Sequence, residues 1–304
     1  KQPGKIVAVG KQAEDMLGRA PKNIETSRPL ENGVISDFDM TQALIGYFFK
    51  HLRKQPGRFS LPIFPRVLIG VPAGITEVER KAVVDAGLSA GARKVYLVEE
   101  PMAAAVGADL PIGEAKASMI LDIGAGTSEV AVVSWGGVVV SKSTAIAGDE
   151  FNSIIANFIR ERHNVLVGDM SAEKLKRKVD IMRDDQDQQL TIRGRNLNSG
   201  LPKEIVISRE DIREALTAPI SKVADLVRDI IEETPPELVS DLVPRGLVVS
   251  GGGAQLLGID QYLAQTLEIP VRVAESPELC VIKGLAKILD DKELLEKVQV
   301  AWGH

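Results

Sequence analysis

Residues 119–134 read MILDIGAGTSEVAVVS: an apolar run that ends in Asp122, a glycine turn, Thr127, and a second apolar run. An unpaired carboxylate is costly to bury in such a run, so we expect Asp122 to meet a cation or to face water. Gly124 and Gly126 permit a tight turn whose backbone N–H groups can bind an anion, and Thr127 adds a hydroxyl. The stretch fits a hairpin that holds a magnesium–phosphate group, and it also fits an ordinary β-hairpin with a glycine-rich turn.

Two other nucleotide-binding motifs do not fit this stretch. A dinucleotide fingerprint needs a third glycine and a helix after the turn. Here residues 129–133 continue as a strand, and Trp135-Gly136-Gly137 predicts the next turn before a returning strand at 138–141. A P-loop needs Gly-Lys-Ser/Thr at the start of a helix, and the sequence contains no such tripeptide.

The composition sets broad limits on the class of protein. A chain of 304 residues with 44% hydrophobic content can bury a substantial core, divided between two or more domains. A net charge of -5 gives no basic surface for nucleic acid. The single cysteine, Cys280, rules out an internal disulfide framework and fits a reducing cytoplasm. No zinc motif, transmembrane-length segment or signal peptide is visible.

Strands and helices alternate along the sequence, which indicates an α/β protein. Predicted strands lie at 6–10, 66–71, 94–99 and 246–250, and predicted helices at 12–17, 40–54, 76–90, 149–162 and 208–234. Thr76 and Glu79 have capping-box spacing, and Asp149 is the expected cap of its helix. The polar stretch 184–199 predicts surface turns or a small subdomain.

Three further segments contain residues that can bind or act on a ligand. Each of them also has a purely structural interpretation. Glu100 follows a predicted strand and begins a helix, where it can position a water or only stabilise the helix start. The glycine run after the strand 246–250 allows close approach of an adenine or a phosphate, or forms a flexible turn; it comprises Gly251, Gly252, Gly253 and Ala254. A charged helix start can contact a ribose or only face water; it comprises Glu173, Lys174, Leu175 and Lys176.

Taken in their order along the chain, these segments resemble the actin-like ATPase superfamily: the helix start at Glu100, the hairpin at 122–127, the charged helix start at 173–176 and the glycine run at 251–254. Within it, the sequence is similar to the MreB bacterial actins at residues 28–35, 71–80, 99–107 and 234–238, and the resemblance spans nearly the whole chain. It implies an α/β, actin-like two-lobed ATPase fold in which two related α/β domains each carry a smaller subdomain. The implied parts are 1–28 (remnant of the small subdomain of lobe I), 29–113 and 281–304 (large subdomain of lobe I), 114–147 and 209–280 (large subdomain of lobe II), and 148–208 (small subdomain of lobe II).

The resemblance also assigns roles around an ATP molecule. It implies that Asp122 holds Mg²⁺ through water, while Glu100 and Thr127 orient the attacking water of a weak, polymerisation-coupled ATPase. The β- and γ-phosphates would contact the turn residues Gly124, Ala125, Gly126 and Thr127. The ribose would lie near Glu173, Lys174, Leu175 and Lys176, and the adenosine near Gly251, Gly252, Gly253 and Ala254.

Two departures from the family pattern bear on this site. The family's first phosphate loop, an Asp-Gly-Thr hairpin, has no counterpart here, so we expect an N-terminally truncated chain or a degenerate lobe, with ATP affinity reduced. Ala125 stands where the family usually has glycine. If that position needs a positive φ, the Cβ costs roughly 1–2 kcal/mol and weakens the geometry.

The family resemblance implies assembly and location as well. We expect head-to-tail protofilaments, paired, at the inner face of the cytoplasmic membrane, which organise cell-wall elongation proteins and maintain rod shape. Four apolar side chains of a proline-rich segment would insert into the membrane, or else pack beneath the following strand; they are Phe59, Leu61, Ile63 and Phe64.

Two other functions are compatible with the same phosphate hairpin. A small-molecule (sugar) kinase of the superfamily would need an aspartate base and polar sugar contacts, and no segment supplies them. A non-hydrolysing structural filament protein would follow if the first phosphate loop is absent from the native protein.

Overall fold

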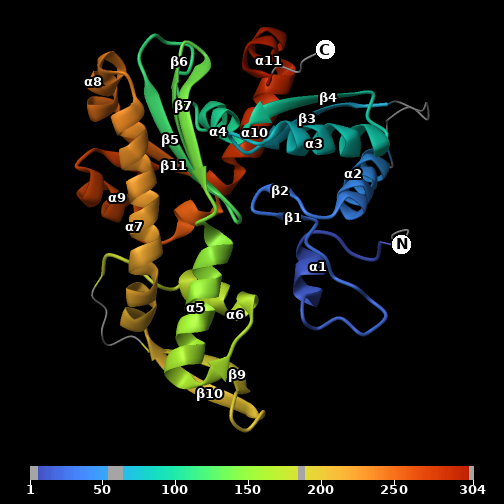
Figure 1. Ribbon diagram of the computed structural model, residues 1–304, viewed down its shortest axis with the longest axis vertical. Coiled ribbons are helices and arrows are strands. Elements are labelled where there is room, and N and C mark those ends of the chain that lie inside the picture. Colours follow the sequence, from blue (N-terminus) through green and yellow to red (C-terminus); the bar gives the residue numbers. More distant parts are fainter. Residues whose placement is uncertain (1–5, 54–63, 184–188, 301–304) are drawn as a thin grey trace. The chain divides into compact units, whose positions relative to one another are not determined.

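The computed structural model describes residues 6–53, 64–183 and 189–300 (Figure 1). The chain divides into two compact units. The first comprises Lys1–Val71, Ile75–Leu97 and Val300–His304, and the second comprises Pro72–Gly74 and Val98–Gln299. Every residue that the sequence suggests for phosphate, ribose or adenosine contacts lies in the second unit.

The first unit begins with a short helix and a hairpin and continues with a strand–helix–strand segment. Its elements are α1 (Lys11–Met16), β1 (Leu30–Glu31), β2 (Val34–Ile35), α2 (Phe38–Arg53), β3 (Arg66–Val71), α3 (Glu77–Ser89) and β4 (Lys94–Glu99), whose last two residues belong to the second unit. β3 and β4 pair in a two-stranded sheet. The capping box is confirmed, because Glu79 N–H donates to Thr76 Oγ1 at 3.2 Å and Thr76 N–H donates to Glu79 Oε2 at 2.8 Å.

Some expectations for the first unit are wrong. Residues 6–9 form no strand, because an isolated apolar run needs a partner strand and no described strand pairs with it. The strand at Arg66–Val71 is present, but Val71 alone is fully buried. α2 is present and exposes the apolar side chains Phe48 and Leu52.

A five-stranded sheet forms the centre of the second unit, in the order β12-β11-β5-β6-β7. Its strands are β5 (Ser118–Ile123), β6 (Ser128–Ser134), β7 (Gly137–Thr144), β11 (Leu247–Ser250) and β12 (Val271–Val273). β12, β11 and β5 run parallel, whereas β6 and β7 are antiparallel to their neighbours. Every residue of β5 and β6 is buried, as expected for strands covered on both faces.

Helices cover both faces of this sheet. Alternate residues of β5 and β6, among them Leu121 and Val132, join one hydrophobic cluster with the helices α5 (Gly148–His163), α7 (Arg209–Glu233) and α9 (Ile259–Leu267). The opposite face of β5 and β6 is covered by α4 (Glu100–Gly107), which packs on α10 (Cys280–Asp290). The predicted apolar stripe of the long helix is buried as expected, including Leu216 and Val223.

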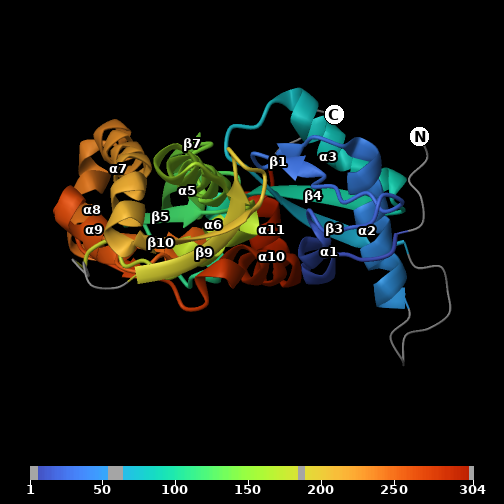
Figure 2. The ribbon, with the colours of Figure 1, turned by 90° about the horizontal axis from the view of Figure 1, so that it is seen from below.

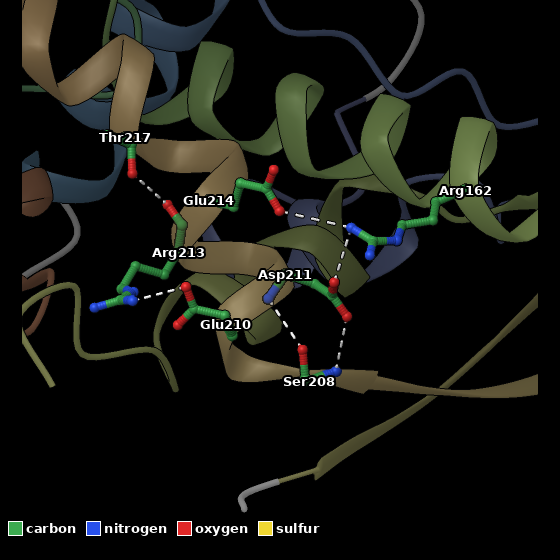
Figure 3. Close-up of polar contacts among 7 residues, drawn as sticks. All are labelled: Arg162, Ser208, Glu210, Asp211, Arg213, Glu214 and Thr217. Atoms are coloured by element: carbon green, nitrogen blue, oxygen red, sulfur yellow. Dashed lines mark hydrogen bonds and ion pairs between the residues drawn. The ribbon is translucent and has the colours of Figure 1, made fainter. Parts of the chain in front are cut away.

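The start of α7 is fixed by a capping box and by an ion pair to α5 (Figure 3). Ser208 Oγ accepts from Asp211 N–H at 3.0 Å, and Asp211 Oδ2 accepts from Ser208 N–H at 3.2 Å. Arg162 from the last turn of α5 lies 3.0 Å from Asp211 Oδ1 and 3.6 Å from Glu214 Oε2. The capping box satisfies backbone N–H groups that a helix start otherwise leaves unpaired.

Further short helices and strands complete the second unit, and several of them are labelled in Figure 1 and Figure 2. They are β8 (Val165–Leu166), α6 (Asp169–Lys176), β9 (Gln189–Asn196), β10 (Pro202–Ser208), α8 (Pro236–Arg245), η1 (Gly252–Gln255), η2 (Pro277–Leu279) and α11 (Lys292–Val298). β10, β9 and β8 form an antiparallel sheet, so the stretch expected as surface turns or a small subdomain contains the strand β9. Within the described ranges, every helix is too short or too polar to span a membrane.

Helices α4 and α10 cross with their backbones in contact. A Cβ added to Gly284 would lie 1.8 Å from the carbonyl oxygen of Ala103, and one added to Gly107 would lie 1.8 Å from that of Cys280. Ala103 and Cys280 are fully buried at this crossing. Only hydrogen fits at the two glycines, so their side-chain size sets the distance between the helices.

We expect Gly284→Ala to lower the stability of the protein despite the higher helix propensity of alanine. The added methyl group must push backbone apart, at a cost of about 3 kcal/mol, or a fall of roughly 5–10 °C in Tm. The control is Gly46→Ala in α2, where no atom lies within 4 Å of the new Cβ. It should be neutral or slightly stabilising. Thermal unfolding of both variants decides, and equal Tm changes would contradict the close crossing.

Candidate functional site

A row of polar side chains crosses the central sheet at one level. The strand registers pair Ser250 with Asp122, Asp122 with Glu129, and Glu129 with Ser143. Asp122 and Glu129 lie directly opposite each other, so their side chains point to the same face of the sheet. Asp122 is 5% exposed and accepts a hydrogen bond from Ser250 Oγ at 2.6 Å, and Glu129 is 1% exposed.

The sequence predicted only Asp122 of this row. Glu129 interrupts an apolar strand just as Asp122 does, so the same signal could have identified it. It was missed because β6 was interpreted as a plain continuation of the hairpin. Ser250 was missed because its role depends on the register with β5.

Of the two carboxyl oxygens of Glu129, only Oε2 is fixed by a hydrogen bond from the backbone. Its Oε2 accepts from the backbone N–H of Ala73 at 3.1 Å. Its Oε1 is buried without a hydrogen-bond partner in good geometry. The Thr127 hydroxyl approaches the same carboxyl group and lowers its pKa slightly.

Three carboxyl groups share this region and disfavour each other's ionisation. Burial, followed by the charge of Asp122, raises the pKa of Glu100 to about 7. Burial, followed by the charge of Glu100, raises the pKa of Glu129 to about 8. Burial also raises the pKa of Asp122, although the hydrogen bond from Ser250 opposes it. A cation placed here would stabilise all three charged forms.

The hairpin turn between β5 and β6 offers unfilled donors. Gly124 N–H donates to the Thr127 carbonyl at 2.8 Å, whereas the N–H groups of Ala125, Gly126 and Thr127 donate to no residue that the structure describes. Three successive free amides in a partly exposed turn form a site for an anion.

The same turn is seated on the first turn of α5. The N–H groups of Gly148 and Asp149 donate to the carbonyls of Gly124 and Ala125, at 3.2 and 2.8 Å. Asp149 was expected to cap this helix; that is wrong, since the N-cap is Ala147. Ala125 does not have a positive φ, so the expected cost of its Cβ does not arise.

The glycine turn after β11 is packed rather than flexible. Gly251 has φ 84°, and a Cβ on it would lie 2.3 Å from the carbonyl oxygen of Ile123. A Cβ on Gly253 would lie 2.2 Å from Ile123 Cγ2, whereas one on Gly252 would have no atom within 4 Å. Two glycines therefore allow the turn to rest on the end of β5, and the middle one leaves open space.

A small cavity that is open to solvent lies beside this turn. Its lining residues are Phe151, Glu173, Lys176, Arg177, Gly252, Gly253, Gln255 and Leu256. The structure thus brings together two segments that the sequence suggested separately. Lys174 is exposed and Leu175 is packed in the core, while Gly251 and Ala254 are buried, so these four do not line the cavity. Arg177 and Gln255 were not predicted, because only the packing of α6 against η1 identifies them.

The buried ammonium group of Lys176 lies between the cavity and the start of α5, to which the hairpin turn is hydrogen-bonded. Lys176 Nζ lies 2.7 Å from Glu173 Oε2 and donates to the carbonyl of Gly148 at 3.0 Å. Arg177 Nε donates to Glu173 Oε1 at 2.7 Å. Burial alone would raise the pKa of Glu173, but the hydrogen bonds from Lys176 and Arg177 hold it at about 2. The carboxylate is therefore charged at all physiological pH values and fixes both cations.

We expect Glu129→Gln to stabilise the protein at alkaline pH. Since the pKa of Glu129 rises to about 8 on folding, the native state binds more protons, and stability falls as pH rises from about 5 to 8. Gln is neutral and can still accept from Ala73. The gain should be near zero at pH 5 and roughly 1–3 kcal/mol at pH 8.5.

Thermal unfolding at the two pH values measures this difference. Glu232→Gln, an exposed site on α7, is the matched control and should show no such gain. A gain for Glu129→Gln that is the same at pH 5 and pH 8.5 would contradict the burial of its charge.

Comparison with known proteins identifies the family. The family model described as MreB/Mbl protein matches residues 1–297. The cell shape-determining protein Mbl of Bacillus subtilis is 42% identical over 298 residues, which are 98% of this chain and 88% of that protein. The cell shape-determining protein MreB of Escherichia coli is 44% identical over 289 residues, which are 95% and 82% of the two chains.

Solved structures agree in fold. The crystal structure of MreB5 of Spiroplasma citri bound to ADP matches with a TM-score of 0.87 and 36% identity, over 96% of this chain and 86% of that one. The MamK double helical filament, at 21% identity, a TM-score of 0.77, and 93% and 85% coverage, supports the fold alone. The predicted actin-like α/β fold is confirmed, and the comparisons give no support to a sugar kinase. The chain belongs to the MreB/Mbl family of actin-like, cell shape-determining proteins.

Proposed function

We propose that this chain binds Mg-ATP at the edge of the central sheet of its second unit, hydrolyses it slowly, and assembles into membrane-associated filaments. The observation that carries the proposal is the run of three unfilled amides at Ala125, Gly126 and Thr127, next to buried Lys176 and buried Asp122. Relatives supply the ligand class, since MreB5 of Spiroplasma citri was solved with ADP and with AMPPNP.

The described residues fit a nucleotide from one end to the other. The free amides would bind the β- and γ-phosphates, because N–H donors that lack internal partners gain most from an anion. Gly252 leaves open space in the cavity for the adenosine. Glu173 and Lys176 line the same cavity and are held rigidly, as hydrogen-bonding partners of a ribose should be.

Asp122 is the residue that would hold Mg²⁺. The described ranges contain no group of three or more His, Cys, Asp or Glu side chains placed to hold a metal ion by themselves. A magnesium ion here would therefore take most of its ligands from water and phosphate, as is usual for this ion. When bound, it neutralises charge on the phosphates. Asp122 would meet it through water, at the end of β5.

Glu100 and Thr127 would position the attacking water. With a pKa of about 7, Glu100 is partly ionised at neutral pH, which suits a group that accepts a proton. Phosphoryl transfer needs little more from a protein than positioning and neutralisation of charge. The site supplies both, and we infer weak hydrolysis.

Self-assembly completes the cytoskeletal role. The MamK relative forms a double helical filament, and the family is cell shape-determining. Head-to-tail contacts that do not close into a ring extend indefinitely. We infer paired protofilaments of this chain, which position cell-wall elongation proteins. We retain the four-part division at residues 28, 113, 147, 208 and 280 as part of this proposal.

We expect Glu100→Ala to suppress phosphate release by about 100-fold or more, because it removes the proton acceptor. ATP affinity should stay within about 3-fold, since the amides and the cavity are untouched. Phosphate release, binding of a fluorescent ATP analogue, and sedimentation with and without Mg-ATP measure the three properties. Glu232→Gln is the control.

Each result separates the alternatives. If Glu100→Ala loses nucleotide binding, Glu100 has a different role. If the parent pellets without nucleotide and releases no phosphate, the chain is a non-hydrolysing filament protein.

The membrane contact is proposed from an apolar segment of the first unit. Phe64 is 58% exposed, and α2 exposes Phe48 and Leu52 just before residue 54. The other suggested residues, Phe59, Leu61 and Ile63, lie outside the described residues. Exposed aromatic and aliphatic side chains favour contact with a membrane over solvent exposure. The sequence around them is basic, which favours an anionic membrane.

We expect Phe59→Ser/Phe64→Ser to weaken binding to anionic phosphatidylglycerol vesicles by about 10-fold or more, because two large apolar side chains no longer leave water. Co-sedimentation with vesicles measures the bound fraction. The matched control is Val243→Ser, which changes an exposed apolar residue of α8 in the second unit. Equal binding by the double variant and the parent would exclude insertion by this segment.

A further inference from the structure

Glu129 is the described side chain whose burial is hardest to explain by packing. It is 1% exposed, it neighbours the carboxyl groups of Glu100 and Asp122, and its Oε1 has no hydrogen bond of good geometry. The next residues on β6, such as Val130 and Val132, are apolar and equally buried. A buried carboxylate is unfavourable unless it is paired, so an apolar residue would serve packing better.

The surroundings of Glu129 show what the free oxygen faces. The Ala73 N–H fixes Oε2 at 3.1 Å and so limits rotation of the carboxyl group. Thr127 lies two residues earlier, where an extended chain directs side chains to the same face. Its hydroxyl is close enough to Glu129 to lower the pKa of that carboxyl.

A threonine hydroxyl has one proton to donate and two lone pairs to accept. If the Thr127 proton points at a water, that water loses a lone pair to the hydrogen bond. If the proton points at a carboxylate, Thr127 can only accept from the water. A water that only donates, to Thr127 and to Glu100, keeps both of its lone pairs, and one of them can attack.

We propose that Glu129 is a positioning residue for ATP hydrolysis: in the Mg-nucleotide complex, where the cation favours the carboxylate form, its Oε1 accepts the Thr127 hydroxyl proton, so that Thr127 presents only lone pairs to the attacking water. This inference rests on the proposed hydrolysis and adds a residue to it. In the step itself the water oxygen bonds to the γ-phosphorus, and the bond from that phosphorus to the β–γ bridging oxygen breaks. Glu100 takes one water proton. Thr127 and Glu129 neither gain nor lose one.

Glu129→Gln tests the direction of this hydrogen bond. The amide can accept from Ala73 through its oxygen, which leaves its NH₂ group facing Thr127 and reverses the hydrogen bond. We expect kcat for phosphate release to fall about 10- to 100-fold, while KM for ATP changes less than about 3-fold. Because the same variant should be more stable than the parent at pH 8.5, loss of activity through poor folding is separable.

A double-mutant cycle shows whether both residues act through one hydroxyl. Thr127→Ser retains the hydroxyl and should keep kcat within a few-fold. Thr127→Val should lower kcat as much as Glu129→Gln does. The double variant Glu129→Gln/Thr127→Val should be no slower than Thr127→Val alone, because the hydroxyl that Glu129 orients is already gone. Glu232→Gln again serves as the control.

The outcomes distinguish this inference from the function it rests on. Parent-level kcat in Glu129→Gln, with the parent active, overturns the positioning role alone. Loss in the double variant equal to the product of the two single losses also overturns it, because the residues then act independently. A parent that binds ATP and releases no phosphate overturns the proposed hydrolysis and this inference together.

Discussion

The second unit depends on one electrostatic constraint: two buried carboxyl groups, Asp122 and Glu129, and the half-buried Glu100 lie within interacting distance at the ends of β5 and β6 and the start of α4. Burial raises the pKa of all three, and the charge of Asp122 further raises that of Glu100 and Glu129. The free amides of the turn at 125–127 and the buried ammonium group of Lys176 lie near the same strand ends. Acceptors and donors that lack internal partners are therefore concentrated in one place, which matches a ligand that contains both a cation and phosphates.

The packing of the second unit holds these groups where they are. Glu100 begins α4, and α4 can move little because its backbone touches α10 at Gly107 and Gly284. The glycine turn rests directly on Ile123, the residue after Asp122. The glycines at these contacts thus help to fix the positions of Glu100 and Asp122. A close-packed interior transmits any change in spacing, so larger residues at these contacts would move both groups.

Features that depend on neighbouring residues in the chain were predictable from the sequence. The capping boxes at Thr76 and Ser208 and the chemistry of Asp122 are of this kind, because spacing along the chain decides them. Glu129 and Ser250 were missed because their partners come from neighbouring strands, and Gln255 because it reaches the cavity only in the folded chain.

One expectation from the sequence was wrong because the segment has no pairing partner in the described structure. The predicted strand at 6–10 failed because a strand needs a pairing partner that its own sequence does not specify.

The same hairpin chemistry serves filament proteins and kinases, so the fold alone could not decide the function. In this chain the buried acids lower the stability of the native state, and the proposed Mg-nucleotide would reduce that loss. The buried acids lower stability as pH rises toward neutrality, and a bound Mg-nucleotide would favour their charged forms. Anything that binds the native state alone stabilises it by mass action. Under the function proposed above, nucleotide binding would stabilise the ends of β5, β6 and α4, the elements that position Glu100 and Thr127. The nucleotide-bound subunit would then be more stable than the free one.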